Sequence, residues 1–290
     1  MSLGKKTSIC LLIGLIIKSS QLKIEFLIST INRTNFDFLK SIFVNLDLDD
    51  IDVLVINQCE KKYIDKAKEL KSTKRIKIIS VQDMGLSKSR NLALANATGD
   101  ICLIADDDIV YNANIFDRIR SDYQNNSFDI ITYSSKIGNK LAQKNLDNGL
   151  IRLHNYRSLF SVMSIQISFS REKIIEKGLS FDNQFGIGSQ YISGEDNIFI
   201  KDAMDNDLKV GKSFFLINNH PEITNTSILT QEILKSKGPL FKRMFNQWAA
   251  FFILIIFYLY KSPLIIKNTN FFNSFYISLI EMIKYQKPKN

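Results

Sequence analysis

Residues 101–108 (Ile-Cys-Leu-Ile-Ala-Asp-Asp-Asp) pass from five apolar residues directly into three carboxylates. A short apolar run of this kind is typical of a strand buried in a parallel sheet. Asp106, Asp107 and Asp108 then fall at the carboxyl end of that strand, where open α/β sheets bind their ligands. Because three adjacent carboxylates repel one another, we expect a divalent cation that holds a phosphate group at this position.

The chain before this point alternates between short apolar runs and segments of helical periodicity. We predict strands at 24–29, 51–56, 76–80 and 101–106, with helices at 35–44, 63–70 and 87–97 between them. Repeated strand–helix units imply a parallel sheet flanked by helices. The sequence therefore predicts an α/β fold with a Rossmann-like, mostly parallel sheet, and its 290 residues suit one such domain with a helical C-terminal appendage.

Polar residues follow each predicted strand, at positions that share one crevice of the sheet. In chain order they are Ser29, Thr30, Asn32, Arg33, Asn57, Gln58, Lys88 and Arg90. Such a set suits a nucleobase, a ribose and a diphosphate. The chain lacks a Gly-x-x-x-x-Gly-Lys-Ser/Thr loop, and no Gly-x-Gly-x-x-Gly follows the first strand, so the P-loop and nicotinamide-binding alternatives are disfavoured.

A second acidic pair, Glu195 and Asp196, precedes the amphipathic run at 198–200. This pattern predicts a helix that begins here, with Ser193 or Gly194 at its cap. Acids in a first helical turn also complement the helix dipole, so their position alone leaves a structural role open. The glycine-containing segment 181–190 just before them is suited to a binding loop.

Taken in order, these motifs resemble the family 2 glycosyltransferases of the GT-A fold, from Lys23 to the region of Ser227. The matching segments are Ser-Thr-Ile-Asn-Arg at 29–33 (Pro-Thr-Tyr-Asn-Arg in the family), Asn57 (usually an Asp that reads uracil), the Arg90-Asn91 pair, the Asp-x-Asp metal signature at 106–108 and the pair at 195–196. Ile31 and Asn57 depart from the family pattern. The Asn side chain still offers uracil both a donor and an acceptor.

This resemblance implies an inverting transfer from a nucleotide-sugar donor, with UDP-sugar expected, to a hydroxyl of a glycan or lipid-linked acceptor of bacterial surface polysaccharides. It assigns a Mn²⁺ or Mg²⁺ cofactor to Asp106 and Asp108, with Asp107 at the turn or the ribose. Asp196 becomes the general base, and Glu195 orients the base or the acceptor. Processive members carry Gln-x-x-Arg-Trp, a spacing that the single tryptophan, Trp248, does not have, so we expect transfer of one sugar.

The two histidines carry less information. We expect His154 at the surface or in contact with the acceptor, and His220 as a metal or phosphate ligand or in a structural turn. Two other classes of protein stay open: an inactive GT-A-like subunit that binds nucleotide or glycan, and a sugar nucleotidyltransferase. The intact acidic motifs disfavour the first class. The absence of glycine in 29–33 disfavours the second.

The C-terminal region is basic and apolar. Residues 232–290 hold eight Lys and one Arg against two Glu, and residues 248–260 are uncharged. No nucleic-acid-binding motif is present, so we expect an anionic membrane surface rather than nucleic acid as the partner, with a buried helix as the alternative. The expected domains are an apolar, basic extension (1–22), which we expect to hold an uncleaved helix at 9–17, the GT-A domain (23–230) and this tail (231–290). Three unpaired cysteines favour the cytoplasm, at the inner face of the membrane.

Overall fold

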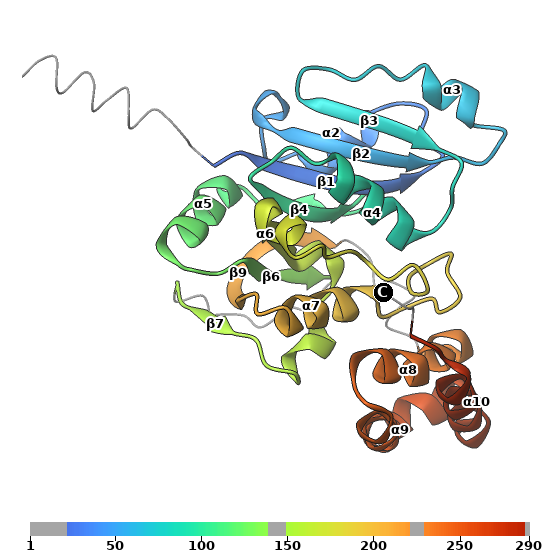
Figure 1. Cartoon of the computed structure of the whole chain (residues 1–290). Helices are drawn as coiled ribbons and strands as arrows, with labels where there is room; N and C mark the ends of the chain where they lie inside the picture. Colours follow the sequence, from blue (N-terminus) through green and yellow to red (C-terminus); the bar gives the residue numbers. More distant parts are fainter. Residues whose placement is uncertain (1–21, 139–148, 221–228, 288–290) are drawn as a thin grey trace, which may run out of the picture.

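The computed structural model describes residues 22–138, 149–220 and 229–287. Its strands are β1 (Ile24–Ile31), β2 (Asp52–Gln58), β3 (Ile76–Val81), β4 (Ile101–Asp106), β5 (Val110–Tyr111), β6 (Ile130–Ile137), β7 (Ile151–Leu153), β8 (Ile167–Ser170) and β9 (Val210–His220). They form one nine-stranded sheet in the order β3-β2-β1-β4-β8-β6-β9-β5, with β7 paired to β9 (Figure 1). The α/β fold class predicted from the sequence is confirmed.

The first four predicted strands all exist, and they pair in parallel. The five apolar residues of β4 are buried, as the continuous apolar run predicted. In the register of the sheet, Ser29 lies opposite Asp106 and Thr30 lies opposite Asn57. The polar residues that follow these strands therefore meet at one edge of the sheet.

The other half of the sheet is mixed, which the sequence pattern did not reveal. Strand β8 runs antiparallel to both β4 and β6, while β9 is parallel to β6. The short strands β5 and β7 both pair antiparallel to β9. The far end of β9 brings His220 back to the edge that carries the acids.

Helices cover both faces of the sheet, over two separate apolar cores. Helices α4 (Leu86–Asn96), α6 (Arg171–Glu176) and α7 (Glu195–Asp205) contribute to one core, and α2 (Asp37–Ile42) and α5 (Ile115–Asn125) to the other. A short helix α3 (Ile64–Lys68) and three 3₁₀ turns, η1 (Leu48–Asp50), η2 (Ser158–Ser161) and η3 (Ser164–Gln166), complete this part. Gly194 is the N-cap residue of α7, so the helix begins where the sequence predicted.

Three helices follow the sheet and pack together beside α7 (Figure 1). They are α8 (Gln231–Met244), α9 (Gln247–Asn268) and α10 (Phe271–Lys284). Small residues allow α8 and α10 to approach closely, because a Cβ on Gly238 would lie 2.0 Å from the Ser278 carbonyl oxygen. Arg243 ties α8 to α7 and to the loop before it through hydrogen bonds of 2.7–2.9 Å to Asp202 and Asp182.

Helix α9 contains the uncharged run at 248–260 and extends beyond it. Within the described ranges it is the one helix long and apolar enough to cross a membrane, with a mean hydropathy of 2.1 and 22% of its apolar window buried. Most of this window is not buried, so α9 is not the buried helix of the alternative interpretation. The predicted N-terminal helix at 9–17 and the family boundary near 227 lie outside the described residues.

Candidate active site

The three acids at the end of β4, Asp106 to Asp108, have different surroundings. The side chains of Asp106 and Asp108 are 35% and 57% exposed, and both lie at the open edge of the sheet. Burial raises the pKa of the Asp106 carboxyl, Arg90 opposes this rise, and Asp108 adds to it. The described residues thus leave the negative charge of this turn incompletely compensated, a condition that favours a cation.

Asp107 points back into the protein and holds the loop that follows β1. Its Oδ2 atom accepts hydrogen bonds from the Thr30 hydroxyl and from Arg33, whose Nη2 lies 2.7 Å away. Arg33 Nε also donates to Thr30 Oγ1 at 3.1 Å. Arg33 is therefore engaged by an acid of the same turn, and it fixes that turn against the end of β1.

Arg90 lies at the centre of the site and is 2% exposed. Its Nη1 donates to Asp196 Oδ1 at 2.8 Å and to Glu195 Oε1 at 3.1 Å, while Nη2 lies 3.5 Å from Asp106 Oδ1. One buried guanidinium thus joins the acids after β4 to the acids that open α7. Helix α4 positions it, with Ser89 Oγ bonded to Ser29 Oγ at 2.8 Å.

Asp196 uses both carboxylate oxygens in this network. Oδ1 faces Arg90, and Oδ2 accepts the backbone N–H of Ser164 at 2.9 Å. Burial raises the pKa of Asp196 to about 7, against the opposing effect of Arg90. A carboxylate with a pKa near neutrality is suited to take a proton from a hydroxyl, since general bases work best close to the working pH.

Two amides at the end of β2 fix neighbouring loops. Asn57 accepts the N–H of Arg33 at 2.9 Å and donates to the Arg33 carbonyl at 2.8 Å, so its amide is occupied by the loop after β1. Asn32 also binds this region, through Glu60 at 3.1 Å. Gln58 donates to the carbonyls of Asp83 and Gly85 at 2.6 and 3.0 Å and so holds the turn before α4.

A pocket of about 520 Å³ adjoins these amides, between the ends of β2 and β3 and the start of α4. Its lining includes Gln58, Ser89 and Asn91, and the ion pair between Lys88 and Asp83, 2.6 Å apart, lies at its wall. Lys88 is half exposed. This pocket joins two of the segments that the sequence assigned to donor binding, the end of β2 and the start of α4.

His220 reaches the acidic turn from the end of β9. Its Nε2 lies 3.2 Å from Asp108 Oδ2, although the two residues are far apart in the sequence. No three acidic, histidine or cysteine side chains of the described ranges converge tightly enough to hold a metal ion by themselves. Oxygen ligands from Asp106 and Asp108 nonetheless suit Mg²⁺, which often takes one or two carboxylates and completes its coordination with substrate phosphates.

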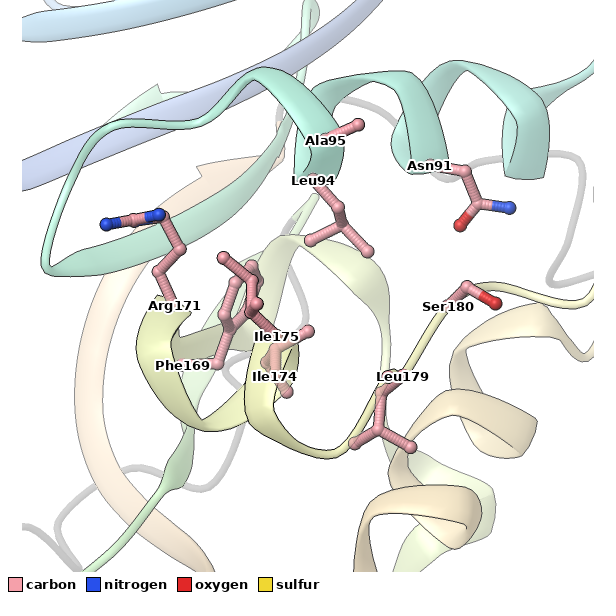
Figure 2. Close-up of a pocket in the computed structure, with 10 residues that line it drawn as sticks. Asn91, Leu94, Ala95, Phe169, Arg171, Ile174, Ile175, Leu179 and Ser180 are labelled. Carbon is pink, nitrogen blue, oxygen red and sulfur yellow. The ribbon is translucent and has the colours of Figure 1, made fainter.

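A second pocket, of about 290 Å³, lies between α4, α6 and residues 178–180 (Figure 2). Its lining is mostly apolar and includes Leu94, Phe169, Ile174 and Leu179 (Figure 2). Of the motifs that the sequence assigned to the site, only Asn91 lines it, and Asn91 also lines the pocket beside Gln58. The pocket that adjoins the donor-side residues is therefore the one beside Gln58.

His154 is buried, so the prediction that it lies at the surface is wrong. The ring is 7% exposed and bonds to Thr132 Oγ1 at 2.7 Å and to Ser158 Oγ at 2.8 Å. Burial lowers the pKa of His154 to about 4, so the ring is neutral at physiological pH. The polar residues around His154 in the sequence gave no sign of this burial, because one of its partners, Thr132, comes from the distant strand β6.

Two residues near the acids were not predicted from the sequence. Ser164 in η3 binds Asp196, and its hydroxyl lies 3.5 Å from Asp106 Oδ2. Lys237 of α8 approaches the start of α7, where its Nζ lies 3.4 Å from Ser193 Oγ. Neither belongs to a recognisable motif, and only the folded chain brings them to the site.

Residues 28–170 match the profile of glycosyl transferase family 2. Among solved structures, S. aureus TarS 1-349 in complex with UDP-GlcNAc is 15% identical with a TM-score of 0.55, over 78% of this chain and 67% of that chain. The complex of TarS 1-349 with UDP gives a TM-score of 0.54 at 15% identity, over 78% and 66% of the two chains.

A longer S. aureus TarS structure gives a TM-score of 0.53 at 15% identity, over 78% of this chain and 40% of that chain. These similarities show a shared fold. No curated protein matches the sequence. The family match spans β1 to β8, which includes the loop after β1, Arg90 and the acids after β4. Residues 28–170, 143 of the 290 residues, are thus similar to glycosyl transferase family 2, and the chain is a glycosyltransferase of the GT-A fold.

Proposed function

We propose that this enzyme transfers one sugar, with inversion, from a UDP-sugar to a hydroxyl of a glycan or lipid-linked acceptor in surface polysaccharide synthesis. The observation that carries the proposal is the buried Arg90, which holds Asp106 and the pair Glu195–Asp196 around one guanidinium. The transfer needs two groups of acids, one at the leaving group and one at the nucleophile. The site offers both, side by side.

Asp196 is the proposed general base. Its raised pKa lets it accept a proton from the acceptor hydroxyl at neutral pH, and the partners Arg90 and Ser164 fix its orientation. Glu195, also held by Arg90, orients the base or the acceptor. Attack from this side, opposite to the leaving diphosphate, inverts the anomeric carbon.

Asp106 and Asp108 are the proposed ligands of a Mg²⁺ or Mn²⁺ ion, with His220 beside Asp108 as a further candidate. Such an ion supplies positive charge to the diphosphate as the glycosidic bond breaks. Asp107 keeps the turn in place through Thr30 and Arg33. Arg33 and Arg90 do not replace the ion, because both are already paired with carboxylates.

A uridine nucleotide is the proposed donor base. Support comes from the family pattern at Thr30 and Arg90, and from the S. aureus TarS structures with UDP-GlcNAc and UDP. The pocket beside Gln58 and Lys88 offers amide and charged groups for the nucleoside. Ser29 and Asn32 belong to the same strand end and loop. Asn57 shapes this region through the backbone of Arg33.

A panel of nucleotide sugars tests the proposal. We expect Mn²⁺- or Mg²⁺-dependent binding and slow hydrolysis of a UDP-sugar by the purified protein. Asp106→Asn and Asp108→Asn should remove hydrolysis without changing the melting temperature by more than a few degrees. Hydrolysis at the wild-type rate in either variant would remove that residue as a metal ligand. Binding without turnover of any donor would support the inactive-subunit class instead.

The sugar nucleotidyltransferase class makes a different prediction. Such an enzyme would release pyrophosphate from UTP and a sugar 1-phosphate. We expect no pyrophosphate from these substrates. Its release would overturn the proposed function.

We also propose that the tail, 231–290, attaches the catalytic domain, 23–230, to the anionic inner face of the cell membrane. Large apolar side chains are exposed along α9 and α10, among them Trp248 (75%) and Phe272 (82%). Lysines occur in the same helices, including Lys261, Lys267 and Lys284. Exposed aromatics beside basic residues are typical of a helix that lies in the membrane interface.

A further inference from the structure

Lys237 is the one described residue of the C-terminal helices with a hydrogen bond to the Ser193-Gly194 turn at the start of α7. Its Nζ lies 3.4 Å from Ser193 Oγ, just before the pair Glu195–Asp196. One turn further along α8, Leu240 packs on Gly194, where an added Cβ would lie 2.7 Å from Leu240 Cδ1. Lys237 and Leu240 are three residues apart and share a helix face. Helix α8 thus presents this lysine to the catalytic carboxylates from a fixed position.

The described residues around the Lys237 ammonium group stabilise it only weakly. Its one hydrogen bond is long, and Glu195 already pairs with Arg90 at 3.1 Å. No acid of the described ranges lies within ion-pair distance of Lys237 Nζ. An ammonium has three donors, so most of its hydrogen-bonding capacity is unused by the described residues.

Placing a lysine here carries a cost. The side chain is half-buried, and the loss of solvent lowers the pKa of Lys237 to about 8, with Glu195 opposing this change. A half-buried cation without an ion-pair partner destabilises the folded state. A substrate group that pairs with it would offset this cost.

We propose that Lys237 binds an anionic oxygen of the acceptor, so that the acceptor carries a phosphate close to its reactive hydroxyl. This inference rests on the proposed function, in which Glu195 and Asp196 face the acceptor and Asp106 and Asp108 face the donor. Lys237 lies beside the first pair. An ammonium is a common phosphate-binding group in proteins.

Binding of inorganic phosphate to the full-length protein, followed by ³¹P NMR while UDP and Mg²⁺ saturate the donor site, tests the proposal. We expect wild type to bind phosphate and Lys237→Met to bind it about tenfold or more weakly, since a charge-assisted hydrogen bond is lost. Lys237→Arg should stay close to wild type. Lys235→Met, two positions away on α8, is the matched control and should also stay close to wild type.

Three results would overturn the inference: no phosphate binding by wild type, equal binding by wild type and Lys237→Met, or a loss as large in Lys235→Met. If wild type binds phosphate in the absence of UDP and saturating UDP displaces it, Lys237 serves the donor diphosphate and the acceptor assignment is wrong. The melting temperature of each variant is measured as well, and a value close to wild type shows that weaker phosphate binding does not result from a folding defect.

The outcome stays separate from that of the proposed function. Metal-dependent hydrolysis of a UDP-sugar needs water rather than a phosphorylated acceptor, so wild type can be assayed for it without phosphate, and the Lys235→Met control should match wild type within about threefold, an effect of less than 1 kcal/mol. If wild type neither binds UDP nor hydrolyses any nucleotide sugar, the proposed function fails, whatever the phosphate titration gives.

Discussion

Asp196 has partners on both of its oxygens, Arg90 on one and the Ser164 N–H on the other. A replacement by Asn keeps the shape but removes the ability to accept a proton. We expect Asp196→Asn to lower the rate of transfer about 10²–10⁴-fold, the usual contribution of a general base. Calorimetry should give a UDP affinity close to wild type. Transfer at an unchanged rate would remove Asp196 as the base.

The raised pKa of Asp196 predicts a pH dependence. Only the deprotonated carboxylate accepts the proton, so kcat/KM should rise with pH and reach half of its plateau near the pKa of about 7. The profile is measured between about pH 5 and 8 under conditions where the protein stays folded. A flat profile through neutral pH would show that this carboxyl does not titrate in the rate-determining step.

Removing Arg90 should lower the stability of the protein. Arg90→Met would leave Asp106, Glu195 and Asp196 without their shared cation in a buried position, and we expect a loss of about 3–5 kcal/mol in the free energy of unfolding. Denaturant unfolding measures it. The control is Arg75→Met, which breaks the more exposed pair with Asp52 and should cost about 0–1 kcal/mol. Similar costs for both variants would contradict the central role of Arg90.

Some residues of the site could be predicted from the sequence and others could not. The acids at 106–108 and 195–196 could be predicted as site residues because each follows a recognisable strand or helix boundary. The contact between His220 and Asp108 could be guessed only from family resemblance, since β9 brings the two together late in the chain. Lys237 looked like one more surface charge of a basic tail, because nothing in its neighbours reveals the contact of α8 with α7.

At the scale of elements, the close approach of α8 and α10 depends on Gly238. Gly238→Ala would place a Cβ 2.0 Å from the Ser278 carbonyl oxygen, so the helices must separate. We expect a loss of about 1–3 kcal/mol or more in the free energy of unfolding, as for other overpacked positions. Unfolding by denaturant measures it, with Ser262→Ala on exposed α9 as the control. A stability equal to wild type would show that α10 moves without cost.

Elements differ in how well the sequence predicts them. Strands β1 to β4 and helix α4 were predictable because apolar runs alternate with helical segments, and the runs of β1, β2 and β4 become buried. Strand β8 was not, since its four residues follow two 3₁₀ turns and carry alternating serines rather than a continuous apolar run. Its antiparallel pairing depends on contacts far along the chain, which a local pattern does not contain.

For the whole molecule, membrane attachment can be followed with a natural probe. Trp248 is the only tryptophan of the chain and is 75% exposed at the start of α9. We expect vesicles rich in anionic lipid to shift its emission to shorter wavelength, because the indole ring enters the apolar interface. Neutral vesicles should have a smaller effect, and high salt should weaken the shift. No shift with either kind of vesicle would contradict attachment through this face.

The packing of Leu240 on Gly194 has a practical consequence for anyone who produces the enzyme. The exposed aromatic side chains of α9 and α10 invite removal of the C-terminal helices to improve solubility. A cut before residue 231 would also take away the support for the first turn of α7 and the anchor that Arg243 forms with Asp182 and Asp202. Solubility is better sought by polar substitutions at exposed positions such as Phe272 and Tyr276, which leave α8 in place.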